Sequence, residues 1–182
     1  MARNHVAVIA LVAIVAATAG VLLARVSFDS GGPLPQKAMT AGTVLNPPRP
    51  MPEFALVSHD EKPFTRERLR DRWSLLFFGF TNCPDVCPAT LTVLAQMEKG
   101  FQDLPAEQRP QIILVSVDPE RDTPQQLTSY VKFFSPSFVG LTGSKENIES
   151  FTQALGVPVA ISKSSDGSYS VDHSASIFLI DP

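Results

Sequence analysis

The sequence predicts an α/β domain, because short apolar runs alternate with helical patterns along residues 53–182. Four apolar runs suit buried strands, and they cover residues 74–80, 112–117, 138–141 and 176–180. Helical patterns cover residues 89–101, 124–134 and 144–155 between them. Strands separated by helices favour parallel pairing, so we expect the central strands to run in the same direction.

Capping and turn residues support these boundaries. Thr123 is suited to an N-cap and Pro124 to the first helical position, while Gly156 follows the helix predicted to end at residue 155. Asp166 and Gly167 form a hairpin signal within the segment 159–172. We therefore expect the last strands to be antiparallel and the whole sheet to be mixed.

The last apolar run is followed at once by Asp181 and Pro182, where the sequence ends. An apolar edge strand without a neighbour is an aggregation hazard. We therefore expect the sequence to be truncated at its C-terminus, with a return strand and a final helix still to follow.

Composition divides the chain into three parts. Residues 53–182 are long enough for one domain with a single core. Residues 27–52 contain six prolines and three glycines but few large apolar side chains, so we interpret them as a tether. With 15 Lys and Arg against 18 Asp and Glu, the chain has a net charge of −3, which argues against a nucleic-acid partner.

The first 26 residues predict a membrane anchor. No charge lies between Arg3 and Arg25, and a helix over the uncharged residues 6–24 nearly matches the roughly 30 Å apolar core of a bilayer. A signal peptide cleaved near residues 17–19 is the alternative, although the apolar run continues beyond that site. Because the segment lacks the character of a mitochondrial presequence, we expect a single-pass protein of a bacterial inner membrane with its domain in the periplasm.

Both cysteines of the chain lie in the stretch TNCPDVCP, at residues 81–88. Cys83 follows a predicted strand and regular helix is expected near Pro88, so the pair should occupy a strand-to-helix turn. Backbone N–H groups at such a turn favour thiolates and lower the pKa of a thiol. Thiols at this spacing are close enough for a disulfide and for one shared metal ion. Inert core residues are a third interpretation, which the flanking prolines make unattractive.

The cysteine pair alone does not decide between a redox-active disulfide and a metal site. Redox pairs more commonly have the spacing C-x-x-C, and a zinc site needs four ligands or three plus water. Of the three histidines, His5 flanks the predicted anchor, and His59 lies in a polar hairpin where we expect it to be solvated. His173 directly precedes a predicted buried strand, near the rim where functional groups gather. Two thiolates and one imidazole, if they converge, suit a cuprous ion.

Three motifs in order resemble the Sco/SenC family: GFTNCPDVCPATL at 79–91, SVDPERDTP at 116–124 and VDHSASIFLIDP at 171–182. Members of that family are thioredoxin-like copper-binding proteins that assist the assembly of cytochrome c oxidase. The resemblance covers residues 53–182, and an anchor followed by a tether agrees with it. It implies a thioredoxin-like mixed sheet flanked by helices.

The resemblance also implies a metal site and a role. Cys83, Cys87 and His173 would bind one copper ion, cuprous or cupric, and the domain would help to metallate the binuclear copper site of oxidase subunit II. Another periplasmic copper chaperone is a further expected partner. The segment VDHSA lies where thioredoxin-like proteins carry a cis-proline, which favours metal binding over redox catalysis, so we do not expect an enzyme.

Two alternatives stay open. A thiol–disulfide oxidoreductase would use Cys83 and Cys87 as a redox-active disulfide and reduce the cysteines of the oxidase copper site. A copper or redox sensor would use the same ligands to signal instead of transferring metal.

The motif DPERDTP has a simpler interpretation. Asp118 and Asp122 follow a predicted strand and bracket Arg121, which predicts a salt bridge in the loop beside the helix N-cap. We do not expect Asp118 to be a metal ligand, although it is placed to shape the site or to dock a partner.

Overall fold

The structure is a computed structural model that describes Thr18, residues 42–164 and residues 167–182. Pro50–Pro182 form one compact unit, and residues 42–54 contain neither helix nor strand. The predicted anchor at 1–26 lies outside the described residues except for Thr18, and so does the first part of the predicted tether, 27–41. Among the residues that are described, no helix combines the length and the apolar character needed to cross a bilayer.

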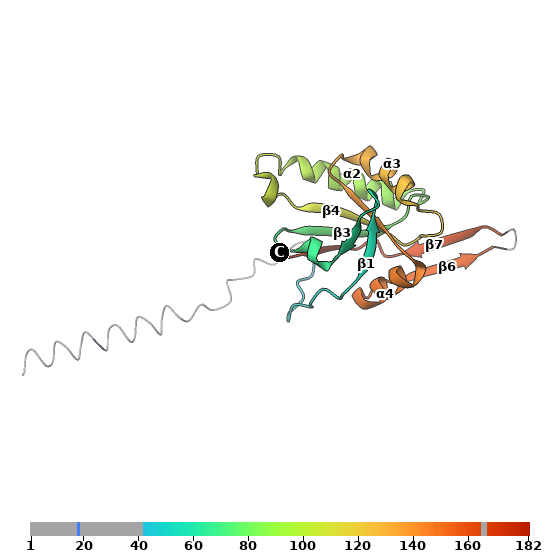
Figure 1. Cartoon of the computed structure of the whole chain (residues 1–182), viewed down its shortest axis with the longest axis horizontal. Helices are drawn as coiled ribbons and strands as arrows, with labels where there is room; N and C mark the ends of the chain where they lie inside the picture. The colour runs from blue at the N-terminus through green and yellow to red at the C-terminus, as the bar shows by residue number, and fades with distance from the viewer. Residues whose placement is uncertain (1–17, 19–41, 165–166) are drawn as a thin grey trace, which may run out of the picture. The chain divides into compact units, whose positions relative to one another are not determined.

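Two sheets organise the compact unit (Figure 1). The larger has six strands in the described residues, in the order β2-β1-β5-β4-β3-β8, and the smaller is the hairpin β6-β7. The strands are β1 (Ala55–Ser58), β2 (Pro63–Thr65), β3 (Ser74–Gly79), β4 (Gln111–Ser116), β5 (Val139–Thr142), β6 (Val159–Lys163), β7 (Tyr169–His173) and β8 (Ile177–Ile180). In Figure 1 the hairpin extends away from one end of the larger sheet.

The centre of the large sheet is parallel and its flanks are antiparallel. β3 pairs with β4 and β4 with β5 in parallel, whereas β1, β2 and β8 join antiparallel to their neighbours. β3 and β4 are almost continuously buried, as expected of central strands with both faces covered. The predicted mixed α/β sheet is therefore confirmed, as is the antiparallel hairpin at the end of the chain.

Three α-helices cover the two faces of the sheet. Helices α2 (Val86–Lys99) and α3 (Pro124–Phe134) lie on one face, and α4 (Lys145–Leu155) lies on the other (Figure 1). Successive side chains of β3 point to opposite faces of the sheet and so contact the helices on both faces, because side chains alternate along a strand. The Phe78 ring packs against Phe151 of α4, with centroids 5.8 Å apart. Two short 3-10 helices, Arg66–Leu69 and Ala106–Gln108, complete the unit.

Helix α2 begins three residues earlier than the predicted start at residue 89, so the expectation that residues 83–87 form only a turn is wrong. Asp85 is the N-cap, which makes Pro88 the third helical residue. The first four N–H groups of a helix have no intrahelical partner, so the missing N–H of Pro88 costs no hydrogen bond there. Cys87 consequently lies inside the first turn of the helix.

The caps of the other two helices agree with the sequence. The Thr123 side chain accepts a hydrogen bond from the Gln126 N–H, and the Gln126 side-chain oxygen accepts one from the Thr123 N–H, which completes a capping box before Pro124. Ser144 caps α4, and Gly156 ends it with a left-handed φ of 72°. Helix ends that carry such residues are therefore predictable to within a residue here.

His59 does not have the solvated environment that the sequence suggested. Its side chain is partly buried, and its Nδ1 accepts a hydrogen bond from the Gly140 N–H at 3.2 Å. Its backbone carbonyl accepts from the Thr128 hydroxyl at 2.7 Å. Burial lowers the pKa of His59, the positive charge of Lys132 lowers it further, and Asp60 acts in the opposite direction. The neutral imidazole thus connects the turn between β1 and β2 to β5.

We expect the free energy of unfolding to fall as the pH decreases through the ordinary histidine pKa of 6.5. Below that pH the unfolded chain binds a proton at His59 that the folded chain resists, so the stability contribution is complete above 6.5 and is lost towards the lower folded pKa. Urea denaturation between pH 5 and 8 measures the slope, with His59→Gln as the comparison. Equal slopes in the two proteins would contradict the assignment to His59.

Candidate metal centre

The two cysteines flank the junction between β3 and α2. Cys83 lies in the loop after β3, and Cys87 is the second residue of α2. The Cys87 backbone N–H points at the Cys83 Sγ atom, 3.4 Å away. Both thiols are free, Cys83 is 8% exposed and Cys87 is completely buried. Cys87 therefore forms the floor of the site and Cys83 part of its rim.

Gly79, the last residue of β3, makes room for the Cys87 side chain. A Cβ atom at position 79 would lie 2.9 Å from the Cys87 Sγ atom, and 3.1 and 3.2 Å from the side chains of Phe77 and Leu114. A side chain at position 79 would therefore force the Cys87 sulfur to shift and crowd the other two side chains, whereas glycine lets α2 bring its sulfur against the strand. Gly79 is not among the predicted site residues, although a glycine within an apolar strand signals this kind of close approach.

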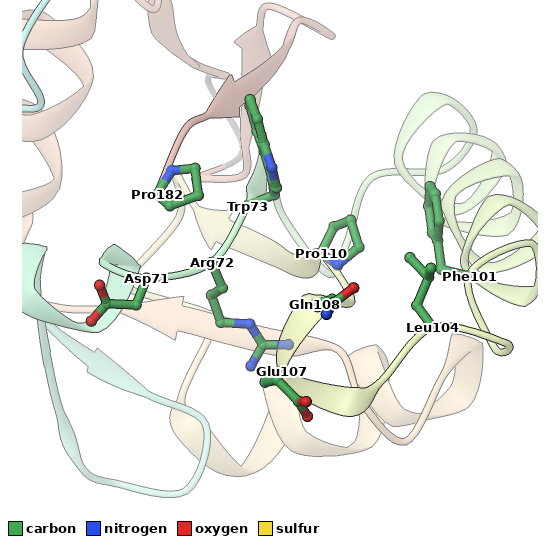
Figure 2. Close-up of a pocket in the computed structure, with 9 residues that line it drawn as sticks. All are labelled: Asp71, Arg72, Trp73, Phe101, Leu104, Glu107, Gln108, Pro110 and Pro182. Atoms are coloured by element: carbon green, nitrogen blue, oxygen red, sulfur yellow. The ribbon is translucent and has the colours of Figure 1, made fainter.

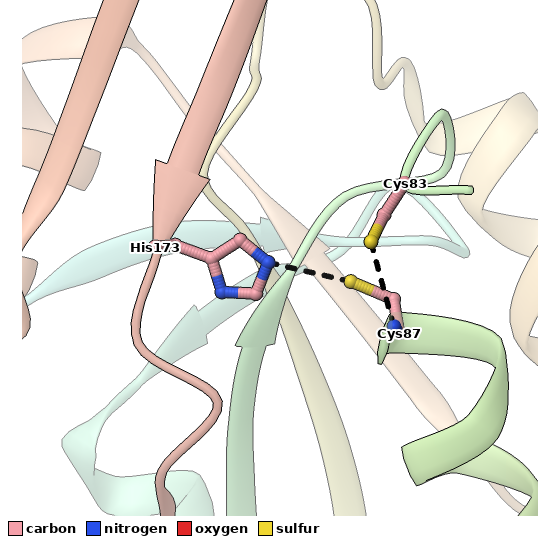
Figure 3. Close-up of side chains that lie close together, drawn as sticks. All are labelled: Cys83, Cys87 and His173. Atoms are coloured by element: carbon pink, nitrogen blue, oxygen red, sulfur yellow. Dashed lines mark hydrogen bonds between the residues drawn. The ribbon is translucent and has the colours of Figure 1, made fainter. Parts of the chain in front are cut away.

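His173 reaches the cysteines from the opposite side, at the end of β7 (Figure 3). Its Nε2 atom lies 3.4 Å from the Cys87 Sγ atom, and its Nδ1 atom lies 2.9 Å from the carbonyl oxygen of Ser174. Because a carbonyl oxygen can only accept, Nδ1 carries the proton, and in the neutral ring Nε2 presents its lone pair to the sulfurs. The rings of Phe77 and Phe80 contact the imidazole edge-on, at centroid distances of 6.2 and 5.6 Å.

His173 precedes the last strand, as the sequence predicted, and it is also the last residue of β7. The predicted convergence occurs: one ligand atom from each of Cys83, Cys87 and His173 lies within 4.8 Å of the other two. Atoms bound about 2.0–2.3 Å from one ion lie at most about 4.6 Å apart. Small side-chain movements would therefore let all three reach a single ion, and their softness fits a transition metal such as copper.

The expectation of a lowered thiol pKa is wrong for Cys87. Burial, and to a smaller extent the hydrogen-bonded neighbour Cys83, raise the pKa of this thiol to about 12. Desolvation raises the pKa of Cys87 more than the N-terminus of α2 lowers it, because the sulfur lies in the apolar core instead of at the helix surface. At neutral pH the metal-free thiol keeps its proton, and a cation is needed to stabilise the thiolate.

A buried carboxylate anchors the loop that carries Cys83. Asp122 is fully buried and accepts hydrogen bonds from the Thr81 backbone N–H, the Thr81 hydroxyl and the Ser116 hydroxyl, at 3.0, 2.6 and 2.6 Å. Burial raises the pKa of Asp122, and these hydrogen bonds oppose that change. Arg121 makes its predicted ion pair with Asp118, whereas Asp122 anchors the loop.

The cysteine–histidine cluster is distinct from the two hollows found in the described part of the chain. One, of about 470 Å³, lies beside Trp73 and Pro110, which precede β3 and β4 (Figure 2). The other, of about 850 Å³, lies between α4 and the hairpin β6-β7. Neither is lined by Cys83, Cys87 or His173. The cluster is thus separate from both of these hollows.

Comparison with known families agrees with the motifs. The family described as SCO1/SenC matches residues 44–182. The chain belongs to the SCO1/SenC family. A relative named "Putative copper-binding protein", from Stutzerimonas stutzeri, is 44% identical over 136 residues, which cover 74% of this chain and 65% of the relative. The SCO1/SenC chain thus spans just under two thirds of the length of this relative.

Solved structures of family members share the fold. The crystal structure of Arabidopsis thaliana ScoI with copper bound has a TM-score of 0.65 and 40% identity, covering 71% of this chain and 80% of that one. BsSco, described as a member of the Sco family of cytochrome c oxidase assembly proteins with a disulfide switch, has a TM-score of 0.56 and 30% identity, covering 72% and 77%. The thioredoxin-like arrangement implied by the resemblance is therefore confirmed for the described domain.

Replacing Gly79 by alanine should destabilise the domain by roughly 1–3 kcal/mol, because the new methyl group overlaps the Cys87 sulfur in a packed core. Gly100→Ala is the matched control, because Gly100 follows α2 with an ordinary helical φ of −68° and a Cβ atom there would approach a single atom, the Met97 carbonyl oxygen, at 3.2 Å. We expect that control to change stability by less than about 1 kcal/mol. Chemical denaturation measures both variants, and equal effects would show that Gly79 is not required for the sulfur's position.

Proposed function

We propose that this protein is a membrane-tethered copper chaperone that binds one copper ion through Cys83, Cys87 and His173. The convergence of the three soft ligand atoms within 4.8 Å carries the proposal. Two thiolates and an imidazole satisfy a three-coordinate cuprous ion, and the same set accepts a cupric ion. Copper described as bound in the related ScoI structure supports the choice of metal.

The client in this proposal is the binuclear copper site of cytochrome c oxidase subunit II. Membership of the family supports an oxidase-assembly role, and the solved relative BsSco is described in those terms. Residues 1–26 would anchor the chain in a bacterial inner membrane, with the copper domain in the periplasm and residues 27–52 as the tether. A second periplasmic copper chaperone would supply the metal.

The environment of the thiols favours metal transfer over thiol exchange. Disulfide exchange needs a thiolate nucleophile that its substrate can reach. Cys87 is fully buried and its pKa is raised to about 12, so it is protonated and shielded until a cation binds. Copper provides that cation and displaces the proton. We therefore infer that the protein acts by coordination and is not an enzyme.

We expect His173→Ala to lower the affinity for the cupric ion by a factor on the order of 100 or more, while the two sulfurs retain weak cuprous binding. Copper stoichiometry and the thiolate-to-copper absorption band of the reduced protein measure this loss. His59→Gln is the control, because it removes a histidine outside the cluster. Equal cupric affinity in wild type and His173→Ala would overturn the assignment of the third ligand.

The oxidoreductase alternative rests on the adjacency of the two free thiols and on the disulfide switch described for BsSco. In that case Cys83 and Cys87 would become a disulfide as the client disulfide gains two electrons and two protons. Reduction of a disulfide-bonded peptide from the client would then persist in His173→Ala. If the wild type binds no copper and His173→Ala still reduces the peptide, the oxidoreductase proposal replaces the chaperone proposal. A sensor would bind copper but transfer none to the client.

A further inference from the structure

The strand that carries His173 has no backbone pairing with the large sheet in the described residues. β7 pairs only with β6, from Val159 opposite His173 to Lys163 opposite Tyr169. Every second residue of β7 faces inward: Tyr169 and His173 are partly buried and Val171 is 7% exposed, while Ser170 is exposed. Side-chain contacts of this inner face therefore set the orientation of the hairpin.

Tyr169 makes several of these contacts. Its hydroxyl donates a hydrogen bond to Asp118 Oδ1 at 2.6 Å, and its backbone carbonyl accepts one from Arg121 at 3.4 Å. The Arg121 guanidinium also lies over the Tyr169 ring, 4.0 Å from its centroid. Asp118 is 2% exposed, and its second oxygen pairs with the Arg121 Nε. Tyr169 is thus held at its ring, its hydroxyl and its carbonyl.

The same arginine connects this contact to the wall of the metal centre. The Arg121 guanidinium lies 5.9 Å from the Phe80 ring centroid, and the Phe80 ring contacts the His173 imidazole. Asp118 and Arg121 belong to the loop after β4, so they are fixed to the central strands. A hydrogen-bonded and stacked path therefore runs from the rigid sheet to both ends of β7's inner face.

We propose that Asp118, Arg121 and Tyr169 form a latch that positions His173 as the third copper ligand. Tyr169 and His173 lie on the same face of β7, two pleats apart. A rotation of β7 about its axis would turn the Nε2 atom away from the sulfurs, and the latch opposes that rotation. Tyr169 is a positioning residue that does not itself touch the metal. The inference rests on the proposed copper role.

The test uses the full chain with Tyr169→Phe, which keeps the ring and removes the hydroxyl bonded to Asp118. Ser170→Ala, which removes an exposed hydroxyl from the next residue of the strand, is the matched control. Cupric affinity is measured by chelator competition and cuprous affinity in parallel. In the metal-free protein, the nuclear Overhauser contact between the His173 and Phe80 rings reports the imidazole position directly.

We expect Tyr169→Phe to weaken cupric binding about tenfold, with a smaller loss for the cuprous ion, which two thiolates already hold. The contact between the His173 and Phe80 rings should weaken, and Ser170→Ala should match wild type in every measurement. Cupric affinity within twofold of wild type, with the ring contact unchanged, would overturn the latch.

Two further outcomes are distinguishable. If wild type binds no copper, the proposed function fails, and the ring contact in the metal-free protein still decides whether the latch positions His173. If Tyr169→Phe does not fold, Arg121→Lys takes its place, because lysine keeps a charge beside Asp118 but loses the flat group stacked on Tyr169. An unaltered ring contact in that variant would count against the latch.

Discussion

Two buried carboxylates in a single loop hold the two halves of the cysteine–histidine cluster. Asp122 fixes Thr81, at the start of the loop that carries Cys83, and Asp118 fixes Tyr169, on the strand that carries His173. Both follow β4, the strand at the centre of the parallel pairing. Because each carboxylate is buried and satisfied by hydrogen bonds, the loop transmits the rigidity of the sheet to both sides of the site.

The cluster combines one completely buried sulfur with two partners nearer to solvent. Cys87 lies in the apolar core against Gly79, while Cys83 and His173 close over it. Removing the sulfur from water makes its charged form expensive in the absence of a cation, and it also strengthens the attraction once a cation is present. The same burial that suppresses thiol reactivity therefore favours a bound soft metal ion.

The sequence predicted the structure well wherever a residue type has one preferred local role. Apolar runs marked the strands, Thr123 and Gly156 marked helix ends, and three separated motifs singled out the three residues that the structure brings together. Tertiary effects were harder to predict. The early start of α2 required knowing that Pro88 falls within the first turn, and the pKa of Cys87 depends on packing that no local pattern encodes. Asp118 and Asp122 look equivalent in DPERDTP, yet they bind opposite sides of the site.

The three clustered residues are distributed very unevenly along the chain. Cys83 and Cys87 are neighbours, but His173 is 86 residues beyond Cys87. Closing a loop of that length carries an entropy cost, which the contacts of the intervening elements, β4, β5 and the hairpin among them, offset in the folded domain. A chain synthesised only as far as the two cysteines still lacks His173. The complete cluster is therefore a property of the finished domain, and unfolded copies cannot compete for the ion with all three groups.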